Sequence, residues 1–151
     1  MCKLIVALIL ALPLAAPLAA EAQTPPAAAP AARTPSPPGA EVYIISPRNG
    51  AKVKSPVLVQ FGLKGMGVAP AGVKFENSGH HHLLIDTDAP ADLAAPLPAT
   101  DNIRHFGKGQ TETSLTLPPG KHTLQLLLGD QNHIPHDPAV ISKKITITVE
   151  K

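Results

Sequence analysis

The chain has 151 residues, a formal net charge of +2, and only four aromatic residues, three Phe and one Tyr. A small net charge without a basic run, combined with so few aromatic rings, argues against nucleic-acid binding. The length leaves room for one domain of typical size with one hydrophobic core.

The first 22 residues have the pattern of a secretory signal peptide, with a basic start, an apolar core and a small-x-small cleavage site. Pro13 and Pro17 interrupt the apolar part, which suits a membrane span of about 20 residues poorly. A retained N-terminal anchor is the alternative. Cys2 is the only cysteine of the chain and lies within the predicted signal peptide. A cleaved protein therefore has no cysteine that could form a disulfide, bind a metal ion or act as a nucleophile. We therefore expect a periplasmic or secreted protein with signal peptide 1–22 and no membrane span after signal cleavage.

Residues 23–39 consist almost entirely of Pro, Ala, Thr and Ser. Such a segment buries too little apolar surface to offset its chain entropy, which predicts a disordered linker. The remaining residues, 40–151, are expected to form the folded domain.

Short runs of strand-forming residues alternate with turn signals throughout residues 40–151. The expected strands cover residues 41–46, 57–63, 80–86, 103–106, 113–117, 122–129 and 140–149. Residues 64–78 and 87–102, rich in Gly, Pro or Ala, are expected loops. This pattern predicts an all-β fold, an immunoglobulin-like antiparallel β-sandwich of about seven strands. A cupredoxin-like sandwich or another small β-barrel is the alternative.

The histidines are concentrated in one half of the chain, from residue 80 to residue 136. In the predicted sandwich, the connections after the second, fourth and sixth strands meet at one end, which brings six of the seven histidines together. Side chains alternate along a strand, so His80 and His82 share one face of the third strand. His81 then points inward beside Leu83 and Ile85.

Neutral imidazole is a common ligand of copper and zinc, and three or four rings within reach of one another make a site. The sequence therefore predicts a copper or zinc ion as cofactor. The predicted ligands are His80, His82, His105, His133 and His136. As further ligands, or as hydrogen-bond partners of the ligand rings, we consider His81, Asp130 and Asp137. The remaining histidine, His122, follows a Pro-Pro-Gly turn and is expected to be structural, with its ring bonded to nearby backbone.

Four segments resemble a family of short exported bacterial proteins, domain-of-unknown-function family 4399. The segments are residues 62–72, the Gly-His-His-His-Leu-Leu-Ile-Asp motif at 79–86, residues 105–111 and residues 126–137. The resemblance covers nearly all of residues 41–149. It implies an exported single-domain protein and carries no established activity.

Together these patterns favour an exported histidine-rich metal-binding domain of the bacterial envelope that is not catalytic. Its expected partners are a metal ion and an envelope protein. One alternative is a structural or interaction module whose histidines form a hydrogen-bond network. A copper-dependent redox enzyme is the second alternative, although cleavage exposes Gln23 instead of the N-terminal histidine that a histidine brace requires. No Gly-x-Ser-x-Gly motif of a serine hydrolase is present.

Overall fold

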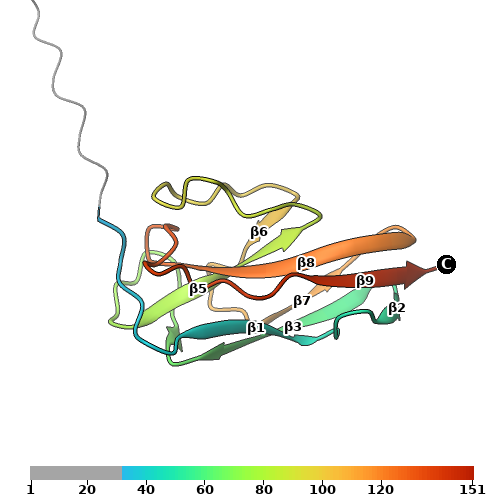
Figure 1. Cartoon of the computed structure of the whole chain (residues 1–151), viewed down its shortest axis with the longest axis horizontal. Coiled ribbons are helices and arrows are strands. Elements are labelled where there is room, and N and C mark those ends of the chain that lie inside the picture. Colours follow the sequence, from blue (N-terminus) through green and yellow to red (C-terminus); the bar gives the residue numbers. More distant parts are fainter. Residues whose placement is uncertain (1–31) are drawn as a thin grey trace, which may run out of the picture.

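The computed structural model describes residues 32–151, so the predicted signal peptide and residues 23–31 of the predicted linker lie outside the described residues. In the described part every regular element is a β-strand (Figure 1). The strands are β1 (Glu41–Ser46), β2 (Lys52–Lys54), β3 (Val57–Lys64), β4 (Gly67–Val68), β5 (Ser78–Ile85), β6 (Ile103–His105), β7 (Glu112–Leu115), β8 (Gly120–Gly129) and β9 (Ile145–Glu150). Between residues 32 and 151 there is no helix with the length and apolar character needed to cross a membrane.

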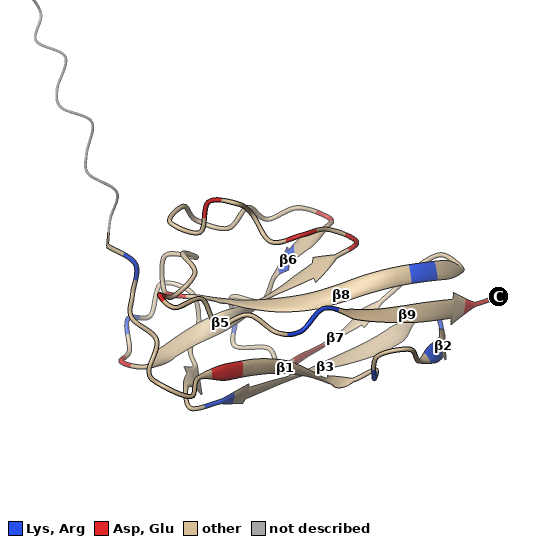
Figure 2. Ribbon diagram, viewed as in Figure 1, with Lys and Arg blue, Asp and Glu red and all other residues tan. Residues whose placement is uncertain are grey.

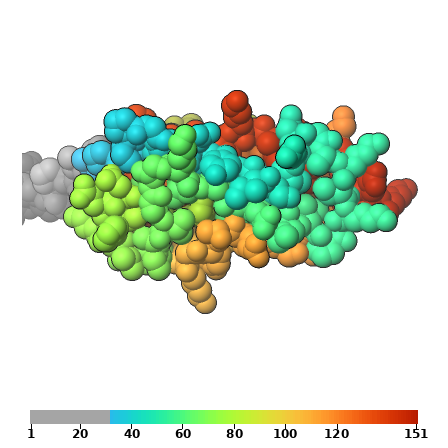
Figure 3. Space-filling model, turned by 90° about the horizontal axis from the view of Figure 1, so that it is seen from below, coloured from blue at the N-terminus to red at the C-terminus, as the bar shows by residue number. Residues whose placement is uncertain are grey.

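The strands form two sheets that pack on each other (Figure 1). One sheet has three strands in the order β1-β3-β7, and Figure 3 views the molecule from the side of this sheet. The other sheet has the order β2-β9-β8-β5-β4, and β6 pairs with β5 as well. The predicted all-β sandwich with antiparallel main strands is confirmed, and only the short strands β2 and β4 pair parallel, with β9 and β5, among the described residues. Its main strands are divided between the sheets as in immunoglobulin-like sandwiches, apart from β6.

The main core lies between the sheets and follows the predicted alternation of side chains. On β3, Val57, Val59 and Phe61 point inward and are at most 4% exposed. They meet Leu83 on β5 and Leu126 on β8, both fully buried. Burial of each such side chain stabilises the fold by about 1.5–3 kcal/mol. This core fixes which face of β5 looks into the sandwich.

A second, smaller core lies on the outer face of the six-stranded sheet. Residues 87–102, here called the cover segment, cross this face without forming a strand or a helix. Leu97 of the cover segment packs with Leu84 of β5, Ile103 of β6 and Leu127 of β8. All eight residues of β5 are buried, and the two cores explain why the run Leu83-Leu84-Ile85 is apolar on both faces of the strand. Acidic residues are spread along the cover segment (Figure 2), and the carboxylate of Asp88 pairs with Lys144.

Two of the seven expected strands differ from the expectation, and two short strands were not expected: β2, and β4 within the expected loop of residues 64–78. The fourth expected strand, β6, pairs with β5 in the six-stranded sheet, although the immunoglobulin-like order places it beside β7. Ile103 of β6 packs in the second core, and this contact holds β6 against the six-stranded sheet. The last strand begins at Ile145, because the chain before it makes only isolated bridges to β8, through Pro135 and Ile141. Proline cannot donate a ladder hydrogen bond, which keeps this stretch irregular.

Residues 33–36, here called the N-terminal strap, are ordered against the loop of residues 130–138. The backbone amide of Ser36 donates to the carbonyl of Asp137 at 3.0 Å, and the amide of Asp137 donates to the carbonyl of Thr34 at 2.9 Å. This part of the expected linker is therefore bound to the domain. Hydrogen bonds of these backbone groups and of the side chains at residues 33 and 34 offset the chain entropy that is lost when the segment becomes ordered.

Candidate metal centre

Four of the five predicted ligands meet at one point. They are His80 and His82 of β5, His105 of β6 and His133 of the 130–138 loop. One ring nitrogen from each lies within 4.8 Å of the other three. Four nitrogens this close to one another all lie within about 3 Å of a common centre. Zinc–nitrogen bonds are about 2.0–2.1 Å long, so each nitrogen has to move toward that centre by up to about 1 Å to bind zinc.

One nitrogen pair already has the spacing that a metal ion needs. Nε2 of His80 and Nδ1 of His133 are 3.2 Å apart, a distance at which the two rings can also share a hydrogen bond. Nitrogens on a tetrahedral zinc ion are separated by about 3.3–3.4 Å, given bonds of about 2.0–2.1 Å. The group therefore fits a four-nitrogen coordination sphere with small movements of the rings.

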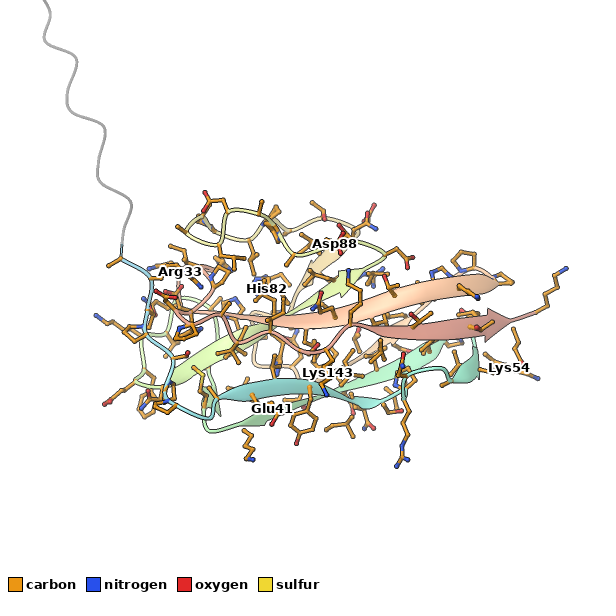
Figure 4. The ribbon with its side chains drawn as sticks, viewed as in Figure 1. Arg33, Glu41, Lys54, His82, Asp88 and Lys143 are labelled. Carbon is orange, nitrogen blue, oxygen red and sulfur yellow. The ribbon has the colours of Figure 1, made fainter. Side chains whose placement is uncertain are left out.

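Strand pairing explains why these rings meet. His80 and His82 share the outer face of β5, as the alternation predicts, and Figure 4 shows His82 on the side of the sheet that faces the cover segment. His105 lies directly opposite His82 in the β5–β6 ladder. We expected the turn between the fourth and fifth strands to bring His105 to the other histidines. In the structure β6 instead pairs directly with β5, which carries His80 and His82.

The fourth ligand comes from the loop that follows β8. Gly129, the last residue of β8, pairs with His80, so the loop begins beside the histidines. His133 then turns back over them with a φ of 66°, a left-handed conformation that is uncommon outside glycine. Its carbonyl accepts a hydrogen bond from the amide of Leu97 at 2.9 Å, which ties the loop to the cover segment.

Two glycines make room for the rings. A Cβ atom at Gly129 would lie 2.8 Å from Cε1 of His82 and 3.2 Å from its Nδ1. A Cβ atom at Gly107 would overlap the ring of His105. The sequence reasoning missed both positions. A glycine two residues after His105 was an available signal, whereas the role of Gly129 depends on a strand register that sequence does not give.

Burial leaves part of this site without hydrogen-bond partners. His80 and His82 are 0% and 1% exposed, while His105 and His133 keep part of their surface in solvent. Nδ1 of His80 and Nδ1 of His82 are buried and bond to no protein atom. Buried polar groups are normally paired. His81 and His136, which lie outside the group, also carry buried ring nitrogens without a protein partner, so a ligand is favoured by the meeting of the four rings and not by these nitrogens.

The surroundings favour the neutral form of His80, His82 and His105. Burial, followed by the charges of the neighbouring histidines, lowers the pKa of His80 to about 4 and that of His82 to about 3. Burial, followed by the nearby His133, also lowers the pKa of His105. The charge of Asp130 acts in the opposite direction on His80. At neutral pH these imidazoles are therefore in the form that binds metal ions.

Neither predicted acidic residue belongs to the group of donors. The buried carboxylate of Asp130 accepts hydrogen bonds from the backbone amides of Asn132 and Ile134, at 2.8 and 3.0 Å. It therefore shapes the loop around His133. Asp137 is exposed and pairs with Arg33 at 3.4 Å.

The structure does not bring His136, the fifth predicted ligand, into the group. Its Nε2 lies 3.2 Å from the carbonyl oxygen of Ser78, and its Cε1 lies where a Cβ atom of Gly79 would point. Gly79 shares a strand face with His81, so His136 lies on the inner face of β5 and the four ligands lie on the outer face. His81 also points inward, where its ring packs on Phe61 with centroids 5.2 Å apart.

The remaining histidine lies near the other end of β8. From His122 to Gly129 the strand spans about 23 Å. Nε2 of His122 lies 2.9 Å from the carbonyl oxygen of Pro118, and its Nδ1 lies 2.7 Å from Oδ2 of Asp86. This histidine joins the ends of β5 and β8. Sequence reasoning anticipated a backbone partner for the ring and missed the carboxylate.

Comparison with known proteins gives a family without an assigned activity. The family model described as domain of unknown function (DUF4399) matches residues 59–150, which include all four clustered histidines. No curated protein and no solved structure matches the chain. Since the match covers more than half of the chain, this protein belongs to the DUF4399 family.

Proposed function

We propose that this domain binds one divalent transition-metal ion, Cu²⁺ or Zn²⁺, through His80, His82, His105 and His133. The observation that carries the proposal is the meeting of four imidazoles from three separate chain segments, with ring nitrogens within 4.8 Å of one another. Two of the rings are buried and carry nitrogens without partners. Burial of imidazole rings with unpaired nitrogens costs free energy, and the binding of an ion would offset this cost.

The donor atoms point to the class of ion. All four donors are imidazole nitrogens, and the group contains no carboxylate and no thiolate among the described residues. Calcium and magnesium prefer oxygen ligands, and Cu(I) prefers sulfur. Imidazole suits Cu²⁺ and Zn²⁺, so these two ions are the ones to test first.

The number of donors supports holding an ion over catalysis. Catalytic zinc sites usually combine three protein ligands with an open position for water or substrate, whereas closed sites use four. The four histidines provide a complete tetrahedral set. The proposed role is therefore the binding or handling of copper or zinc in the bacterial envelope, by a periplasmic or secreted protein that works with an envelope partner.

Titration of the full chain with Zn²⁺ and with Cu²⁺ at neutral pH tests the proposal. We expect one ion per chain with affinity tighter than micromolar. The variant His105→Ala removes a ligand at the edge of the sheet and should weaken binding at least about tenfold. His136→Gln is the matched control, since it alters a histidine on the opposite face of β5, and should change affinity by less than about threefold.

The absence of saturable binding of either ion overturns the proposal. Equal affinities of wild type and His105→Ala do so as well, because a bound ion then lies elsewhere. If cluster variants lower stability while no ion binds, the histidine hydrogen-bond network is the better account of these residues. Circular dichroism of each variant checks that the sandwich is retained.

A further inference from the structure

The N-terminal strap holds the loop that carries His133. Arg33 is largely covered, with its side chain 19% exposed. Its Nε donates to the carbonyl of Pro135 at 2.9 Å, and a terminal guanidinium nitrogen donates to the carbonyl of His136. The strap therefore supplies donors to carbonyl groups of a loop that lies directly beside the four histidines.

One buried carboxylate connects the strap to the ligand. Asp130 is 3% exposed, and its Oδ2 accepts a hydrogen bond from the hydroxyl of Thr34 at 2.6 Å. Its Oδ1 accepts from the amides of Asn132 and Ile134, the two residues that flank His133. The two oxygens of a single side chain thus join the strap to both sides of the metal-binding histidine.

His133 depends on this support because its own backbone favours other conformations. The residue has a φ of 66°, which a side chain with a Cβ atom adopts only when its surroundings hold it there. The amide of His133 donates to the carbonyl of Asp130 at 2.9 Å, so the turn closes on the residue that Thr34 contacts. A loop released from the strap has fewer contacts that keep His133 in this geometry.

We infer that the strap and the metal site are energetically coupled, with Thr34 and Asp130 as positioning residues for His133. This inference depends on the proposed metal binding. Coupling between two sites is reciprocal, so a docked strap strengthens metal binding and a bound ion strengthens strap docking by the same factor. Any event that lifts residues 33–36 from the loop then favours release of the ion.

Trypsin gives a direct measure of strap docking in the full chain. Arg33 is the only Lys or Arg between Lys3 and Arg48. Cleavage after Arg33 requires its guanidinium to leave the loop and enter the protease. We expect saturating Zn²⁺ to slow this cleavage at least about fivefold, the lower end of typical coupling factors. Cleavage after the exposed Arg48, followed by mass spectrometry in the same digest, corrects for any effect of zinc on trypsin.

A matched pair of variants tests the route of coupling. Thr34→Val removes the hydroxyl that bonds Asp130 and keeps the shape of the side chain. Ser36→Ala removes a strap hydroxyl that donates only to the carbonyl of Pro138, at 2.8 Å. Thr34→Val should weaken Zn²⁺ binding about fivefold and speed cleavage after Arg33, whereas Ser36→Ala should change each by less than about twofold.

The possible failures are distinguishable. If the wild-type chain takes up no Zn²⁺, the proposed function itself fails. If it binds Zn²⁺ but cleavage after Arg33 proceeds at the same rate with and without the ion, the coupling is refuted and metal binding stands. Equal Zn²⁺ affinities of wild type and Thr34→Val refute the role of the Thr34–Asp130 contact.

Discussion

Substitution of Gly129 by alanine places a methyl group directly against a predicted ligand. The new Cβ atom would lie 2.8 Å from Cε1 of His82, 3.2 Å from its Nδ1 and 3.3 Å from the carbonyl carbon of His133. Carbon atoms in ordinary contact are about 3.5–4.0 Å apart, so the His82 ring has to move by about 0.7 Å or more. The ring is 1% exposed, so the shift pushes it against other buried groups and not into solvent.

Two measurable losses follow from this crowding. Overpacking of a buried site costs about 1–3 kcal/mol, which lowers the melting temperature of a domain of this size by about 4–12 °C. A ligand displaced by more than about 0.5 Å also binds metal poorly, so Zn²⁺ affinity should fall at least about tenfold.

Gly67→Ala is the matched control for this experiment. Gly67 also lies in a strand, but a Cβ atom there would have its nearest neighbour, Cβ of Ser78, at 3.9 Å. Thermal unfolding without metal and Zn²⁺ titration of both variants separate packing from ligation. A Gly129→Ala protein with wild-type melting temperature and wild-type affinity would refute the assignment of this glycine as space for the His82 ring.

Two further predictions concern histidines outside the group of four. His81 is buried with neither ring nitrogen bonded, so His81→Leu removes two unpaired polar atoms and should leave the melting temperature unchanged or raise it, with Zn²⁺ affinity within about twofold. A fall of more than about 2 kcal/mol in unfolding free energy would show that the imidazole has a partner. Burial lowers the pKa of His122, but hydrogen bonds to Asp86 and Pro118 and the Asp86 charge outweigh it, so the pKa is raised. The charged pair therefore stabilises the fold fully below pH 6.5, the approximate pKa of His122 in the unfolded chain, and stabilises it less as the pH rises through the pKa in the folded protein. We expect urea unfolding to show that Asp86→Asn lowers the unfolding free energy by about 1 kcal/mol more at pH 6 than at pH 8.5. Equal costs at the two pH values would contradict a contribution of Asp86 to the raised pKa of His122.

Local patterns in the sequence were enough for the long strands β1, β3, β5 and β8 and for the parity of the histidines. Alternation of Val57, Val59 and Phe61 gives the inner face of β3, because the period of a strand is set by adjacent residues alone. The same period separates His81 from His80 and His82. These predictions need no knowledge of which strands pair.

Features that depend on partners distant in sequence were not predictable. The pairing of His105 with His82 comes from a strand that joined the other sheet, and the choice between His133 and His136 depends on how one loop turns. Both histidines lie in the same short loop, and composition does not distinguish them. The strap was hidden within a Pro- and Ala-rich stretch, where Arg33 and Thr34 were the available exceptions.

The four clustered histidines are spread over 54 positions, and no two of them from different segments are neighbours until the sandwich has formed. An unfolded chain cannot offer this set of donors to one ion, so the affinity of the site belongs to the native state alone. Free metal at about one hundred times its dissociation constant would then add about 2.7 kcal/mol to the stability of the domain. Metal supply in the surroundings of the protein would thereby set how long it survives there, and a molecule that unfolds would return its ion to solution.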